Sequence, residues 1–74
     1  MNVHDVKMVL HNARIAQSKS KDPCFQQNLD KEITSFQSTF TQFMGKPINQ
    51  SSGSKAVPQE IECAVDRLTE CYSV

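Results

Sequence analysis

The sequence predicts an all-α fold: an antiparallel helical hairpin over about residues 3–18 and 23–44, then a flexible loop at 45–57 and a third helix over about 58–72. Two observations predict this arrangement. Apolar residues recur at steps of three and four in each of the three segments, which is the spacing of one helix face. Proline and glycine residues mark where the segments begin and end. At this length, we expect residues 1–74 to form a single small helical domain.

The first predicted helix carries two apolar faces of unequal width. Met8 and Ile15 are seven residues apart and share the narrower face. They are either two scattered exposed residues, which are normal on a protein surface, or a secondary line of contact. The wider face is the one expected to be buried, and it consists of Val3, Val6, Val9, Leu10, Ala13 and Ala16.

The second predicted helix has the clearest boundaries. Asp22 is a good N-cap, and Pro23 suits the first helical position because its missing N–H would have no partner there. At the other end, Gly45 can adopt the left-handed conformation of a helix cap, and Pro47 prevents the helix from continuing. The short link before Asp22 predicts that the first two helices are antiparallel neighbours.

The apolar residues of this second helix fall on one stripe about 100° wide. A strand would need period two, which Phe43 breaks. The stretch from Ile33 to Met44 also contains no ionisable side chain. Exposed helix faces normally carry Lys and Glu, whereas interface cores are depleted in charge and enriched in aromatic residues and Met. One interpretation is a central helix that the other two simply cover. The other, which we favour, is a partner-binding surface formed by Leu29, Ile33, Phe36, Phe40, Phe43 and Met44.

A third helix is expected to begin near Pro58, because Glu60 and Glu62 suit the positive N-terminus of a helix. Glu62, Asp66 and Glu70 repeat every four residues and therefore line one ridge. This ridge is either a solvated face or a contact with the basic first helix or a basic partner. The expected buried face consists of Ile61, Ala64, Val65, Leu68 and Tyr72.

The overall charge excludes several partners. Eight Lys and Arg balance eight Asp and Glu, so the usual electrostatic signature of a nucleic-acid or membrane-surface binder is missing. No apolar run approaches the ~18 residues that span a bilayer, and we expect no membrane association. The three cysteines are an odd number and no signal segment opens the chain, which favours a cytoplasmic location over a secreted disulfide scaffold.

We expect no enzymatic activity, no cofactor and no metal site. A nucleophile pair could in principle combine Cys24, Cys63 or Cys71 with His4 or His11, but no local motif supports one. The spacings of these residues do not match the closely spaced ligand pairs of a zinc site. With only two glycines, the chain also lacks a glycine-rich phosphate loop. An enzyme would remain an option only if Cys63, on the polar side of the third helix, were an unusually reactive thiol.

The function expected from these patterns is non-enzymatic protein–protein interaction, as an adaptor, inhibitor, co-chaperone or assembly subunit. The three apolar stripes are small for the number of residues to be ordered. We therefore expect stabilisation by another protein chain, through homo-oligomerisation or a hetero-partner. The alternative is a small DNA-binding or transcription-modulating protein. The acidic third helix and the long second loop argue against it, and we do not expect nucleic-acid binding.

The stretch SKSKDPCFQQNLDKEITSF, residues 18–36, together with the size of the chain, resembles the small needle subunits and needle co-chaperones of type III secretion systems. The likeness lies in a helical hairpin whose second helix opens with Asp22-Pro23. The resemblance implies a small subunit or co-chaperone of that kind. In that family the second helix continues to the C-terminus, whereas this chain breaks at Gly45-Lys46-Pro47. No functional residue is carried over from it.

Overall fold

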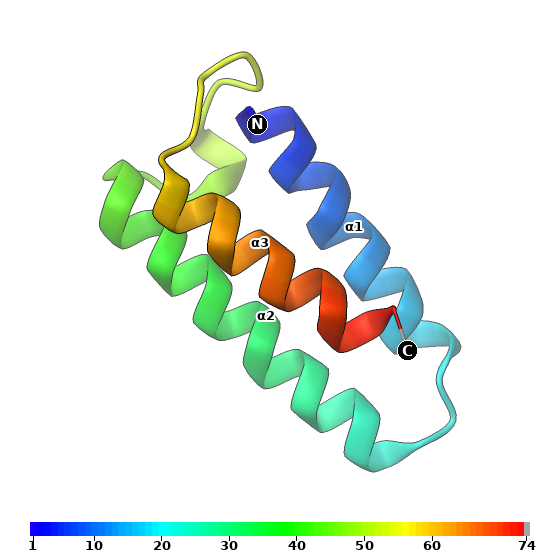
Figure 1. Ribbon diagram of the computed structural model, residues 1–74. Helices are drawn as coiled ribbons and strands as arrows, with labels where there is room; N and C mark the ends of the chain where they lie inside the picture. The colour runs from blue at the N-terminus through cyan, green and yellow to red at the C-terminus, as the bar shows by residue number, and fades with distance from the viewer. Residues whose placement is uncertain (74) are drawn as a thin grey trace.

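The computed structural model describes residues 1–73 and shows three helices lying side by side (Figure 1). They are α1 (Val3–Lys19), α2 (Pro23–Met44) and α3 (Gln59–Tyr72), with a short 3-10 turn, η1 (Ile48–Gln50), after α2. The all-α prediction is confirmed, and each predicted helix boundary lies within one residue of the observed one.

The three helices form a bundle in which every pair is in contact. α1 and α3 run in the same direction and α2 runs opposite to both (Figure 1). The sequence predicted the antiparallel pair of α1 and α2 but left the position of α3 open. In the structure α3 packs against both α1 and α2, so it closes the bundle.

The ends of α2 form as the sequence predicted. The Asp22 carboxylate accepts a hydrogen bond from the backbone N–H of Cys24 at 2.9 Å, which pairs one of the free donors of the first turn. Gly45 adopts the left-handed conformation with φ 78°, and its N–H donates to the Thr41 carbonyl at 2.8 Å. Both ends of the longest helix are therefore determined by local residues.

The turn between α1 and α2 is held together by two glutamine side chains. Gln17 Nε2 donates to the Gln26 carbonyl at 2.9 Å, and Gln26 Nε2 donates to the Ser20 carbonyl. The Ser20 carbonyl follows the last turn of α1, where carbonyl groups have no partner within the helix. These contacts cross the helix pair in both directions and hold α1 antiparallel to α2.

The N-terminus of α1 is capped first by its own neighbouring residues. Asn2 Oδ1 accepts a hydrogen bond from the Asp5 N–H at 3.0 Å, and Asp5 Oδ2 accepts one from the Asn2 N–H at 3.2 Å. This reciprocal pair is a capping box, in which each side chain binds the backbone of the other residue. It was not predicted from the sequence.

The segment between α2 and α3 caps α1 a second time. The N–H groups of Val3 and His4 donate to the carbonyls of Lys55 and Gly53, each at 2.9 Å. The first N–H groups of a helix have no partner within the helix, so the carbonyls of this segment pair with them. The composition predicted a flexible loop at residues 45–57. In the structure its second half is hydrogen-bonded to the start of α1.

The core lies where the apolar stripes of the three helices meet, and Phe40 is its largest fully buried side chain. Among residues 1–73, every buried side chain is apolar, and no buried side-chain nitrogen or oxygen lacks a hydrogen-bond partner. None of the helices described is both long and apolar enough to cross a membrane. The buried residues are Val3, Val6, Leu10 and Ala13 of α1, Leu29, Ile33, Phe36 and Phe40 of α2, and Ile61, Val65 and Leu68 of α3.

The left-handed cap of α2 predicts a specific cost of substitution. Gly45→Ala should lower the free energy of unfolding by about 1 kcal/mol, because a residue with a Cβ is strained at φ 78° even where that Cβ would meet no atom within 4 Å. Urea unfolding followed by circular dichroism measures the change.

Gly53→Ala is the matched control, because Gly53 does not have a positive φ. A Cβ at Gly53 would meet the His4 Cβ at 3.6 Å, an ordinary contact, so its free energy of unfolding should change by less than about 0.5 kcal/mol. An equal loss of stability from both exchanges would contradict the role assigned to the Gly45 cap.

Candidate protein-interaction surface

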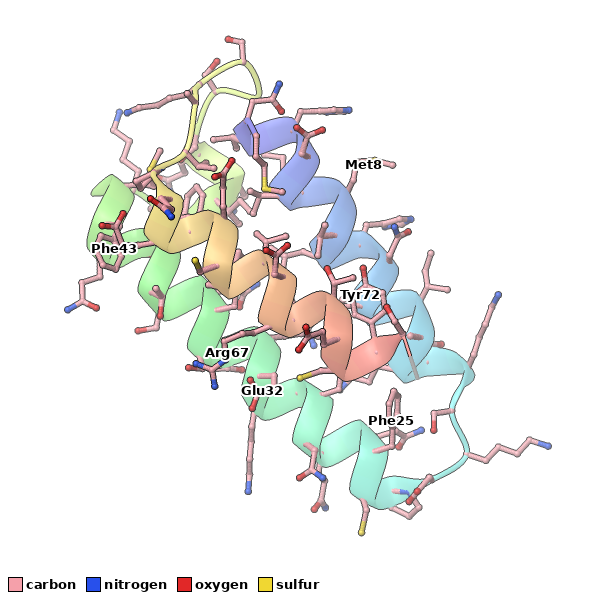
Figure 2. All side chains as sticks on the ribbon, in the orientation of Figure 1. Met8, Phe25, Glu32, Phe43, Arg67 and Tyr72 are labelled. Atoms are coloured by element: carbon pink, nitrogen blue, oxygen red, sulfur yellow. The ribbon has the colours of Figure 1, made fainter. Side chains whose placement is uncertain are left out.

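The structure separates the six predicted partner-binding residues into covered and open positions. Phe43 is 52% exposed, and Figure 2 shows it at the end of α2, on the outer edge of the bundle. Met44 is half-buried and packs against the core. The other four are at most 4% exposed and lie inside this chain's own core: Leu29, Ile33, Phe36 and Phe40. Of the predicted surface, only Phe43 is exposed to solvent, and about half of it is.

The outer face of the second half of α2 is exposed and carries no ionisable side chain. The first half of the same helix differs, because it exposes Asp30, Lys31 and Glu32 in succession. Exposed helix faces normally carry Lys and Glu, and depletion of charge is one of the features of an interface core. The exposed polar residues of this face are Thr34, Ser35, Gln37, Ser38, Thr41 and Gln42.

One edge of this face borders a groove of about 360 Å³ between α2 and α3. Phe36 and Leu68 contribute apolar lining, while Glu32 and Arg67 contribute opposite charges from the two helices. Figure 2 shows Glu32 and Arg67 close to each other on this side of the bundle. Cys63 also lines the groove and is exposed, but no histidine is among the described residues that line it. A thiol nucleophile here would have no imidazole base beside it.

Cys71 lies further along the same pair of helices, where it lines another pocket together with Phe25 and Glu32. Partial burial raises the pKa of the Cys71 thiol, the nearby Glu32 carboxylate raises it further, and Arg67 lowers it in part. Because the thiolate is the reactive form, this thiol is a weak nucleophile near neutral pH.

The other edge of the uncharged face borders a second groove, which lies between α1, α2 and η1. It encloses about 400 Å³ and is lined in part by Leu10 and Ile48, which are apolar. Lys7, His11 and Arg14 project from successive turns of α1 along its rim. We call this the basic groove and define it by these five residues.

The basic groove was not predicted from the sequence. Its rim could have been found, because Lys7, His11 and Arg14 are spaced by four and three residues and therefore share one side of a helix. Its apolar floor could not have been found in this way. Ile48 reaches the floor only because η1 folds back against α2, a contact between segments that periodicity does not describe.

Comparisons of the chain with protein-family models, with curated proteins and with solved structures found no match. Within residues 1–73, no group of three or more His, Cys, Asp and Glu side chains is placed to hold a metal ion. The candidate surface is therefore interpreted from its own geometry and charge.

Phe40 and Phe43 form a matched pair for testing which part of the stripe is core. Phe40→Ala should lower the free energy of unfolding by about 3–5 kcal/mol, because Phe40 is fully buried and its removal leaves a cavity. Phe43→Ala should lower it by less than about 1 kcal/mol, because half of that ring is already in solvent. Thermal and urea unfolding of the two variants measure the difference. Similar losses for both would contradict the burial described here.

The three cysteines should differ in their rate of alkylation. Iodoacetamide at about pH 8 should modify Cys24 and Cys63 before Cys71, because the first two are exposed and the raised pKa of Cys71 reduces its thiolate fraction. Mass spectrometry of peptides from timed samples gives the order. In denaturant the three rates should converge, and a fast reaction of Cys71 in the folded protein would contradict the prediction.

Proposed function

We propose that this protein is a non-enzymatic interaction module that binds another protein chain through the outer face of the second half of α2, with Phe43 as the anchor. The observation that carries the proposal is an exposed aromatic ring at the end of a face of about three turns without an ionisable side chain. A Phe ring adds a large apolar area to an interface, and binding energy concentrates in a few such anchors.

The polar groups of the uncharged face suit binding rather than catalysis. Thr, Ser and Gln side chains both donate and accept hydrogen bonds, and they carry no charge that must lose its hydration when a partner covers them. The chemistry of the thiols also favours binding, because Cys63 lacks an imidazole neighbour and Cys71 has a raised pKa. Such a module would serve as an adaptor, inhibitor, co-chaperone or assembly subunit.

Site-specific photo-crosslinking tests the proposal. With p-benzoylphenylalanine in place of Phe43, irradiation in an extract of the cells that make this protein should give a covalent adduct of discrete mass. A hetero-partner would appear as a new protein in the adduct. Self-association would appear as a dimer of the chain, and purified protein would then give the same product.

The control places the same photo-reactive residue at Asp66, which is exposed on α3 and lies outside the proposed surface. Adducts at position 43 and none at position 66 support the proposal, because they show that the contact depends on the surface. Equal labelling at both positions, or no adduct at position 43, overturns it.

A further inference from the structure

We infer that the basic groove binds an acidic amphipathic helix of the partner protein. This inference rests on the proposed function, since it names the chemistry of a second contact with the same partner. The basic groove and the uncharged face of α2 are adjacent, because Gln37 belongs to that face and also lines the groove. A partner seated on the uncharged face beside Gln37 can therefore extend into the groove.

The apolar part of the groove requires apolar groups on the partner. Leu10 is only 8% exposed and Ile48 is half-buried, so both form the floor of the groove rather than its rim. A groove of about 400 Å³ with an apolar floor accepts apolar side chains from one face of a helix. Purely polar segments would leave this floor without contacts.

The rim of the groove requires negative charge on the partner. Lys7 and Arg14 carry positive charge, and His11 lies between them on the same side of α1. Asp30 pairs with this rim: its Oδ1 lies 3.3 Å from Arg14 Nη1, in a pair that is about half-exposed on both sides. Surface pairs of this kind are weak, so a partner carboxylate can compete for Arg14. Lys7 donates one hydrogen bond to the Ser51 carbonyl at 3.2 Å and keeps further donors free.

α1 exposes further apolar area beside the rim. Met8 is 49% exposed and Ile15 is 38% exposed, and Figure 2 shows Met8 pointing away from the bundle. Both are neighbours of His11 at steps of three and four, but each directly follows Lys7 or Arg14 in the chain and so lies about 100° round the helix from it. The single carboxylate of α1, Asp5, lies in its first turn and is bound in the capping box. The rim is therefore the cationic part of α1, and it complements an acidic helix.

A second copy of this chain fits the groove less well. Its acidic ridge on α3 offers Asp66 and Glu70, while Glu62 is paired with the N-terminal ammonium group at 3.0 Å, and the apolar face of α3 is buried in its own core. The α3 helix of a second copy would therefore bring carboxylates to the rim and leave the floor uncovered. An amphipathic helix from a different protein satisfies both the floor and the rim.

Three synthetic peptides of about 18 residues, five helical turns, test the inference on the full chain. The first carries Leu on one face and Glu on the other. The second replaces Glu with Lys, and the third keeps Glu but replaces Leu with Ala. In a titration of the ¹⁵N-labelled protein, the first peptide should bind about tenfold more tightly than the other two at low salt and shift the amide signals of α1 and η1.

Two charge reversals locate the binding site. Arg14→Glu should weaken binding of the acidic peptide about tenfold, because it reverses a rim charge. Lys21→Glu makes the same change in net charge at an exposed residue outside the groove. It should weaken binding of the acidic peptide by less than about threefold. Equal effects of the two variants, equal binding of all three peptides, or signal shifts confined to other surfaces would each overturn the inference.

A short DNA duplex serves as the competing probe. If the duplex binds more tightly than the acidic peptide and shifts the same signals, the groove recognises phosphate and the inference is overturned. Failure of the inference is distinct from failure of the proposed function. Photo-crosslinking at Phe43 without peptide binding rejects the acidic helix alone, whereas peptide binding without a crosslink at Phe43 rejects the uncharged face.

Discussion

The apolar stripe of α2 must be covered from two sides, and this constraint determines the rest of the structure. Two helices share this stripe, which is about 100° wide: α1 packs against α2 on one flank and α3 on the other. Phe40 reaches zero exposure in this arrangement. The segment between α2 and α3 must then return the chain to the correct end of the bundle. It does so along the N-terminus of α1, where the carbonyls of Gly53 and Lys55 pair with free N–H groups of the helix.

The same constraint leaves α2 with its outer face open and a groove on each side. Charge is distributed unevenly around these surfaces: residues 1–21 contain four basic residues and one acidic residue, and residues 55–74 contain two basic and four acidic residues. In the folded chain the basic rim of α1 borders one groove, while the uncharged face of α2 ends at Phe43. A partner that spans the uncharged face and the basic rim would make both polar and charged contacts. This combination would give specificity, because few segments satisfy both at once.

Local signals allowed most of the secondary structure to be predicted. Asp22 and Pro23 begin α2, and Gly45 ends it, because capping depends on residues within one turn. The capping box at Asn2 and Asp5 was equally local, yet it was not predicted, because Asn and Asp stand where this motif usually has Ser or Thr and Glu or Gln. η1 and the basic groove required knowledge of the tertiary structure. The groove floor is lined by Leu10 and Ile48, which are far apart in the chain.

The sequence by itself determined the number of helices, their limits and the side of each helix that is apolar, because these depend on spacing over a few residues. It also determined that the outer face of α2 is uncharged, because this depends only on which residues lie on that face and not on how other segments pack. Only the tertiary structure decided which apolar residues remain open. Phe40 and Phe43 belong to the same stripe and are three residues apart, yet one is fully buried and the other is half-exposed. Periodicity sets the direction of a side chain, but the position of α3 and the end of α2 determine whether another helix covers it.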